Sequence, residues 1–194
     1  PKEYNGYKAY WNDGGQLVSP HDKNVIAEVE KITDISMVNF TPDESLIEYL
    51  DERFDDIYID KILELSLSPE LIQKHNNLKF VYTPIHGSGY VPVCEALKKD
   101  GFNNVFVVEE QALPDGNFPT VSAPNPETKD ALSLGVKLAE TVDADIVLGT
   151  DPDSDRVGVA VKTSEGFKLL TGNQIGVLLV DFVIRKIDPK QDLK

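Results

Sequence analysis

Several features are scarce or missing in this chain of 194 residues, and each absence excludes a class of protein. Cys94 is the single cysteine, so no disulfide can form within the chain. A lone cysteine fits a reducing compartment. The three histidines are dispersed at positions 21, 75 and 86, which argues against a histidine-based zinc site. No apolar run approaches the roughly 18 residues of a membrane-spanning helix. We therefore expect a cytoplasmic protein without a transmembrane segment.

Positive charge is also scarce, since 19 basic residues face 33 acidic ones and the net charge is −14. That balance argues against the backbone of a nucleic acid, and against an anionic membrane, as the partner. It also means that a phosphorylated ligand needs a local positive site or a metal ion. Hydrophobic residues make up 41% of the chain, which is enough to build a core.

The first part of the chain has short and irregular patterns. Residues 7–18 predict two short strands around a turn at Asn12–Gly15, and Ser19-Pro20 predicts the start of a helix. Residues 34–45 are irregular and are the expected domain boundary. The sequence thus predicts a partial N-terminal α/β segment over 1–44 and a main domain over 45–194. At the start of that domain we expect helices over 44–51 and 55–67, and a short one after Ser68-Pro69.

From residue 78 onward, strands and helices alternate. We expect strands over 78–82, 105–109 and 145–149, with helices over 91–99 and 126–141 between them. This order predicts an α/β fold, a three-layer sandwich with a mostly parallel sheet and right-handed crossovers. Residues 157–161 and 167–170 predict a hairpin, and a last helix is expected over 173–186.

The run Asp151-Pro-Asp-Ser-Asp-Arg156, directly after the strand predicted at 145–149, is the most informative motif. Alternate side chains of an extended segment point the same way, so Asp151, Asp153 and Asp155 can converge beyond the strand end. Converging carboxylates repel one another unless a cation compensates them. Oxygen ligands suit Mg²⁺, Ca²⁺ or Mn²⁺, and the neighbouring Arg156 indicates that a phosphate comes to the same place.

Three alternatives bear on this motif. An EF-hand requires glycine and glutamate where Arg156 and Lys162 stand, so it is excluded. A phosphatase of the haloacid dehalogenase type requires Thr or Val where Asp155 stands. A solvated acidic turn on an acidic protein remains the plain alternative.

Two further segments are ambiguous on their own. The glycine-rich loop from Thr83 to Gly89 follows a predicted strand, so its backbone N–H groups could approach an anion, or it could be only a tight turn. His86 within it is a candidate catalyst or a group that stabilises the turn. Lys8, after an Asn-Gly turn signal, reads as a solvated surface lysine.

Three segments occurring in this order, residues 1–8, 82–89 and 149–156, together resemble the α-D-phosphohexomutase superfamily, and most closely its phosphoglucomutase branch. The resemblance implies a parent enzyme of four domains around a cleft, in which an active-site serine carries a phosphoryl group. That group passes to a sugar phosphate, and the resulting bisphosphate reorients and returns the other phosphoryl group. By this likeness Pro1 follows the missing serine, so the chain holds the end of domain 1 and the whole of domain 2. Alone it is expected to be inactive.

The resemblance also implies roles for individual residues. Asp151, Asp153 and Asp155 are expected to bind one Mg²⁺, with a phosphoserine oxygen as the fourth ligand, and Arg156 to contact that phosphoserine. Lys8 resembles the general acid/base of the family. Many relatives have glycines between the aspartates; Pro152 and Ser154 stand here, which alters the loop and removes no ligand.

The loop residues His86, Gly87 and Ser88 are expected at the substrate cleft. The implied substrate is a sugar phosphate, glucose 1-phosphate or glucose 6-phosphate, with glucose 1,6-bisphosphate as activator and the remaining domains of the parent chain as partners. A mannose or pentose phosphate is the alternative substrate. A non-catalytic metal-binding α/β module is the alternative outside the enzymes.

Overall fold

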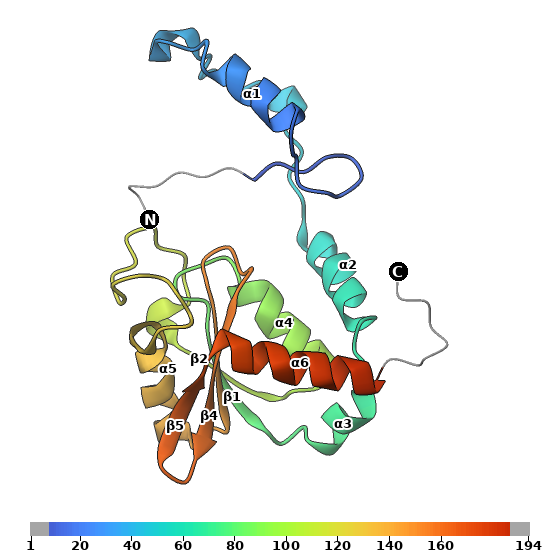
Figure 1. The fold of residues 1–194 in the computed structure, drawn as a ribbon, viewed down its shortest axis with the longest axis vertical. Helices are drawn as coiled ribbons and strands as arrows, with labels where there is room; N and C mark the ends of the chain where they lie inside the picture. The colour runs from blue at the N-terminus through green and yellow to red at the C-terminus, as the bar shows by residue number, and fades with distance from the viewer. Residues whose placement is uncertain (1–7, 187–194) are drawn as a thin grey trace. The chain divides into compact units, whose positions relative to one another are not determined.

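The structure is a computed structural model that describes residues 8–186 (Figure 1). It divides the chain into two compact units, residues 1–50 and residues 51–194. The boundary predicted from the sequence, between residues 44 and 45, lies close to this division, and the domain assignment itself stays a prediction.

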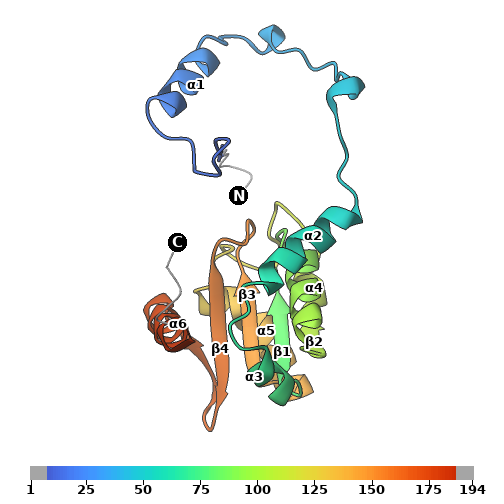
Figure 2. The same ribbon diagram turned by 90° about the vertical axis from the view of Figure 1, so that its right-hand side faces the viewer.

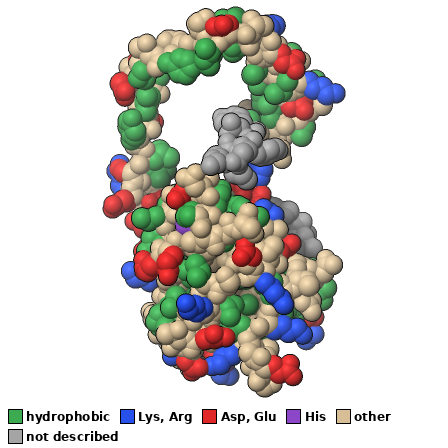
Figure 3. All heavy atoms as spheres, turned by 90° about the vertical axis from the view of Figure 1, so that its left-hand side faces the viewer, with side chains coloured by type: hydrophobic (Ala, Val, Ile, Leu, Met, Phe, Trp, Pro, Cys, Tyr) green, Lys and Arg blue, Asp and Glu red, His purple; other side chains and the backbone are tan. Residues whose placement is uncertain are grey.

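The N-terminal unit has little regular structure. Its described residues form α1 (His21–Val29) and two short 3₁₀ turns, η1 (Ile35–Met37) and η2 (Glu44–Leu46). The two strands expected over 7–18 reduce to a single antiparallel bridge between Tyr10 and Gln16. Helix α1 contains no buried residue, and its apolar residues are about half exposed, as in Val25 at 51% and Val29 at 55%. Figure 3 shows hydrophobic side chains, in green, at the surface of this unit.

The prediction of a helix over 44–51 is wrong beyond the first turn, η2. Its start is marked correctly, because the Asp43 carboxylate accepts a hydrogen bond from Ser45 N. The backbone then becomes extended at Ile47, with φ −103° and ψ 119°. Leu46 and Leu50 are 82% and 65% exposed, so no packed apolar face supports further turns.

The second unit holds the α/β fold. Its elements, in chain order, are α2 (Glu52–Leu63), α3 (Pro69–Lys74), β1 (Lys79–Thr83), α4 (Tyr90–Asp100), β2 (Asn104–Val107), η3 (Glu109–Gln111), α5 (Lys129–Val142), β3 (Ile146–Thr150), β4 (Val157–Thr163), β5 (Gly166–Leu170) and α6 (Gly172–Lys186). Strand order in the sheet is β2-β1-β3-β4-β5. The predicted α/β class is confirmed.

The sheet is mixed. Strand β1 pairs in parallel with both β2 and β3, as the alternating pattern predicted. Strand β4 pairs antiparallel with β3, and the predicted hairpin of β4 and β5 is antiparallel as well. Helices α4 and α5 lie on opposite sides of the sheet (Figures 1 and 2), which is the arrangement that two right-handed crossovers require.

The core lies between the sheet and α5. Its buried cluster consists of Val81, Val108, Ala139, Ala144, Val147 and Ala160. Thr128 caps the first turn of α5 by accepting a hydrogen bond from Ala131 N, and the helix ends where Asp143 adopts a left-handed conformation with φ 55°. By contrast, α6 buries no residue against the described part of the chain, and Val177 and Ile184 are 70% and 68% exposed.

No helix within residues 8–186 is both long and apolar enough to cross a membrane.

Candidate metal centre

The acidic motif is the connection of an antiparallel hairpin. Strand β3 ends at Thr150, β4 begins at Val157, and these two residues are paired across the hairpin. Gly149 of β3 also lies beside Thr83 of β1 in the parallel pairing. The acidic loop (residues 151–156) and the loop after β1 therefore leave the sheet at the same edge, the carboxyl ends of the parallel strands. In open α/β sheets this edge is where ligands bind.

The three aspartates converge, as predicted, in a loop that forms a turn. One carboxylate oxygen from each of Asp151, Asp153 and Asp155 lies within 4.8 Å of the others. Asp151 is buried, whereas Asp153 and Asp155 are exposed. The loop turns at Ser154, which has φ 60° and donates its N–H to Asp151 O over 3.0 Å. Three carboxylate oxygens, two of them on exposed residues, fit a hard divalent cation that keeps part of its water shell. Their role as ligands stays a prediction.

Arg156 compensates the buried carboxylate. Its backbone N–H donates to Asp151 Oδ1 over 3.0 Å, and its Nε–H donates to Oδ2 over 2.7 Å. Asp155 Oδ1 lies 3.7 Å from the same Nε. The hydrogen bond to Asp151 raises the pKa of the Arg156 guanidinium, against the effect of desolvation. Because the Arg156 side chain is 54% exposed, it also presents positive charge to the solvent side of the loop, where a phosphate could approach.

His86 has a structural environment. It is 5% exposed, with Nδ1 3.3 Å from Leu113 O and Nε2 2.8 Å from Thr120 Oγ1. Both ring nitrogens are thus engaged by protein atoms, which matches the alternative of a turn-stabilising group. Its neighbours Gly87 and Ser88 contact the acidic loop at Pro152. A role of this loop in substrate binding stays a prediction.

Lys8 is the first residue that the structure describes, and it is exposed. It belongs to the N-terminal unit, whereas the acidic loop belongs to the second. Its role as a general acid/base stays a prediction. The match of residues 1–7 to the serine segment of the phosphohexomutases, which includes Pro1, lies outside the described residues.

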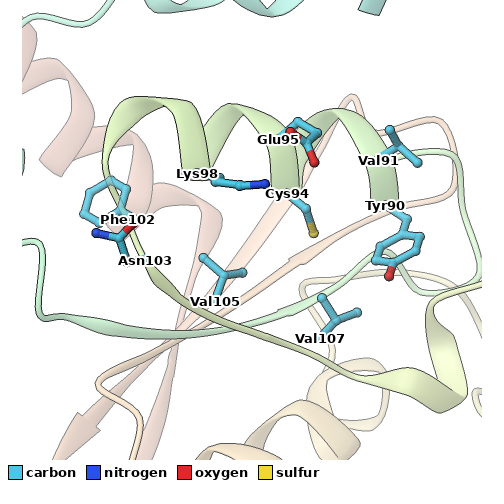
Figure 4. Close-up of a pocket in the computed structure, with 9 residues that line it drawn as sticks. All are labelled: Tyr90, Val91, Cys94, Glu95, Lys98, Phe102, Asn103, Val105 and Val107. Atoms are coloured by element: carbon cyan, nitrogen blue, oxygen red, sulfur yellow. The ribbon is translucent and has the colours of Figure 1, made fainter. Parts of the chain in front are cut away.

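A separate groove of about 410 Å³ lies between α4 and β2 (Figure 4). None of the predicted site residues lines it; its walls are Tyr90, Val91, Cys94, Glu95, Lys98, Phe102, Asn103, Val105 and Val107. Burial, with a smaller effect of Glu95, raises the pKa of the Cys94 thiol to about 11, so this cysteine is no ready nucleophile.

Sequence reasoning missed a buried polar chain behind the site. It consists of Thr83, Gln111, Thr120 and His86, which hydrogen-bond in series. Gln111 has no local signal, because it sits on a short 3₁₀ turn after β2 and meets Thr83, 28 residues earlier, only in the folded chain.

Comparison with known proteins decides the family. The sequence model described as phosphoglucomutase/phosphomannomutase, alpha/beta/alpha domain II, matches residues 56–166. That range includes β1 to β4 and the whole acidic loop. The chain belongs to the phosphoglucomutase/phosphomannomutase family.

Relatives within this family differ in name. A probable phosphomannomutase of Haemophilus influenzae is 37% identical, over 98% of this chain and 39% of its own length. A human phosphopentomutase is 36% identical, over 92% of this chain and 30% of its length. A human glucose 1,6-bisphosphate synthase is 37% identical, over 91% of this chain and 29% of its length. The chain thus spans between 29% and 39% of these family members.

A solved structure agrees with the fold of the family. That of a putative phosphomannomutase from Thermus thermophilus matches 89% of this chain and 36% of its own, with a TM-score of 0.66 and 20% sequence identity.

Proposed function

We propose that this chain is the metal-binding segment of a Mg²⁺-dependent phosphohexomutase. One observation carries the proposal: three aspartate oxygens within 4.8 Å of one another, with Arg156 beside them, in a region that matches domain II of the family. Residues 1–44 are assigned to the end of domain 1 and residues 45–194 to domain 2. The partial coverage of the relatives supports further domains in a longer parent chain.

Asp151, Asp153 and Asp155 would hold the ion, together with a phosphoserine oxygen from the parent chain. When bound, a divalent cation neutralises charge on a transferring phosphoryl group and orients it for in-line attack. Two hydrogen bonds from Arg156 hold the Asp151 carboxylate in place. The exposed part of the Arg156 guanidinium would contact the phosphoserine.

The reaction proposed for the parent enzyme is the interconversion of glucose 1-phosphate and glucose 6-phosphate. The phosphoryl group leaves the serine oxygen as a sugar hydroxyl oxygen bonds to phosphorus, and the hydroxyl proton passes to the Lys8 amine. The resulting glucose 1,6-bisphosphate reorients in the site and returns its other phosphoryl group to the serine. Lys8 can accept a proton near neutral pH only if its surroundings lower its pKa. The names of the relatives equally support mannose or pentose phosphates as substrates.

The test uses the product of the complete gene that contains these residues. Turnover of glucose 1-phosphate, mannose 1-phosphate and ribose 1-phosphate is compared, with catalytic glucose 1,6-bisphosphate present. The highest kcat/KM for glucose 1-phosphate supports the proposal, and a higher value for either other sugar favours the alternative. Mn²⁺ binding without turnover of any of the three sugar phosphates would favour the alternative of a non-catalytic metal-binding module. The 194-residue chain alone is expected to show no turnover.

A further inference from the structure

The loop that follows β1 is packed directly against the acidic loop. Ser88 donates two hydrogen bonds to Pro152 O, from its N–H over 2.9 Å and from its Oγ over 3.0 Å. A Cβ placed on Gly87 would lie 2.7 Å from Pro152 O, 2.9 Å from Pro152 C and closer still to its Cα. These neighbours are backbone atoms, so they cannot move without moving the acidic loop. Only glycine fits at position 87.

A second contact lies at the other side of the same turn. A Cβ on Gly89 would lie 2.6 Å from Ser154 Oγ, 2.5 Å from the Tyr82 hydroxyl and 2.9 Å from Thr150 Oγ1. The Tyr82 hydroxyl is itself hydrogen-bonded to Thr150 Oγ1 over 2.9 Å. The segment 87–89 therefore touches both residues that separate the three aspartates, Pro152 and Ser154.

The loop after β1 is held in an unfavourable backbone conformation. Ile85 and His86 have φ 47° and 59°, which costs of the order of 1–3 kcal/mol for a residue with a Cβ. Their N–H groups are both used: Ile85 N donates to Thr83 Oγ1 over 3.1 Å, and His86 N donates to Gln111 O over 2.9 Å. The surrounding structure thus enforces this conformation.

The hydrogen bonds of the buried polar chain behind the loop all run in the same direction, from donor to acceptor. Thr83 Oγ1–H donates to Gln111 Oε1 over 2.6 Å, and Gln111 Nε2–H donates to Thr120 Oγ1 over 3.0 Å. Thr120 Oγ1–H can then donate to His86 Nε2, because Leu113 O requires the proton of this ring on Nδ1. Each hydroxyl in the series donates once and accepts once. A hydrogen-bonded network that is largely buried rigidifies what it surrounds.

We propose that Gly87 and Ser88 are positioning residues that hold the acidic loop in the shape in which its three carboxylates converge. The aspartates repel one another when no cation is present, so the loop needs an external restraint to keep them together. The restraint acts on Pro152, between the first two aspartates, and is anchored to the sheet through His86 and Gln111. The structural part of this inference stands on the contacts alone; its consequence for metal affinity rests on the proposed function.

The experiment compares Gly87→Ala and Ser88→Ala with the wild-type chain and a matched control, Gly116→Ala. Gly116 lies in the loop after η3, and a Cβ there would meet nothing within 4 Å. Amide hydrogen exchange at Ser154 and Arg156, in the metal-free protein, reports the order of the acidic loop, since both N–H groups bond to Asp151. Mn²⁺ affinity, measured by electron paramagnetic resonance, reports the convergence of the carboxylates.

In Gly87→Ala we expect exchange at Ser154 and Arg156 to accelerate about tenfold and the Kd for Mn²⁺ to rise about tenfold, the usual size for an outer partner of a metal ligand. Ser88→Ala keeps its N–H bond to Pro152 O, so we expect about a two- to threefold change in both. Gly116→Ala should match the wild type. Unchanged exchange and unchanged Kd in Gly87→Ala would overturn the proposal; if that variant does not fold, the same result in Ser88→Ala would do so.

A separate variant tests the proposed function independently of the positioning role. Asp153→Asn, measured alongside, should weaken Mn²⁺ binding. If it does not, this loop is no metal site, and the positioning role is then judged by hydrogen exchange alone. Faster exchange in Gly87→Ala would in that case support it, and unchanged exchange would overturn it.

Discussion

Arg156 holds the buried carboxylate of Asp151 through both of its oxygens, with a backbone N–H on Oδ1 and the guanidinium Nε on Oδ2. Asp151 is 1% exposed, whereas the Arg156 side chain is 54% exposed. Asp151, the most buried acidic residue within 8–186, is therefore neutralised by a positive charge from the same loop. A cation bound to the three aspartates would share that task with Arg156.

The Arg156→Gln variant tests this arrangement. It removes the guanidinium while the backbone N–H still reaches Asp151, so we expect the free energy of unfolding to fall by about 1–2 kcal/mol in the absence of metal. A hydrogen bond to a charged group can contribute more, but the exposure of Arg156 screens this one. Because Mn²⁺ would replace the missing positive charge, its stabilising effect should be larger in the variant than in the wild type. Urea unfolding with and without Mn²⁺ measures both quantities, and an equal or smaller metal effect in the variant would contradict the interpretation.

Asp153→Asn should separate charge repulsion from metal binding. The substitution removes one of three neighbouring negative charges, so the metal-free protein should melt at the same or a slightly higher temperature. The rise in Tm on adding millimolar Mn²⁺ should shrink, because stabilisation by a ligand grows with the ratio of its concentration to Kd. Glu165→Gln, in the turn between β4 and β5, removes a charge outside the acidic triad and serves as the control. Equal Mn²⁺ shifts in wild type and Asp153→Asn would remove this loop as the site.

Local patterns predicted the elements that carry the site. The strands expected over 78–82 and 145–149 are Lys79–Thr83 and Ile146–Thr150, and the predicted convergence of Asp151, Asp153 and Asp155 is present, although a turn at Ser154 produces it. The antiparallel pairing of β4 with β3 was not predicted, although the short connection over residues 151–156 between these two strands favours a hairpin. The helix expected over 44–51 failed because its apolar residues find nothing to pack against within the described part of their unit.

The contacts that support the acidic loop could not be predicted from the sequence either. Gly87 signals a turn, but its fit against Pro152 depends on contact between two loops that are distant in sequence. Ser88 and Pro152, which form a hydrogen bond between these loops, are 64 residues apart. His86 and Thr120 are 34 residues apart, and the long loop that carries Thr120 reads only as rich in proline, asparagine and glycine. Such contacts arise from tertiary packing, which leaves no periodic pattern in the chain.

A pair of leucine substitutions should distinguish the core from the exposed helix α6. Leu132 is 1% exposed and packs on the face of β3 where Gly149 leaves room for it, so Leu132→Ala should cost about 2–5 kcal/mol of unfolding free energy. Leu178 is 59% exposed, so Leu178→Ala should change that free energy by less than about 0.5 kcal/mol. Urea denaturation of both variants gives the comparison. A large loss in Leu178→Ala would mean that α6 is buried in solution, for example by another copy of the chain.

Stability should fall at alkaline pH because of two groups that burial keeps protonated, the Tyr82 hydroxyl and the Cys94 thiol. Burial raises the pKa of Tyr82 to about 12, although its hydrogen bond to Thr150 opposes this, and burial raises the pKa of Cys94 to about 11. Their ordinary values are 10.0 and 9.0. The unfolded chain therefore loses these protons at lower pH than the folded chain, and its ionisation draws the equilibrium toward unfolding.

The contribution of the two groups is complete below pH 9 and declines as the pH rises toward 12. Tyr82→Phe should lose some stability at pH 8, because it removes the bond to Thr150, but its decline above pH 10 should be shallower than in the wild type. The control is Tyr58→Phe, at a tyrosine that is 60% exposed, which should follow the wild-type curve. Urea unfolding at pH 8, 9.5 and 11 measures the slopes. Parallel curves for wild type and Tyr82→Phe would show that Tyr82 ionises in the folded protein as readily as in the unfolded chain.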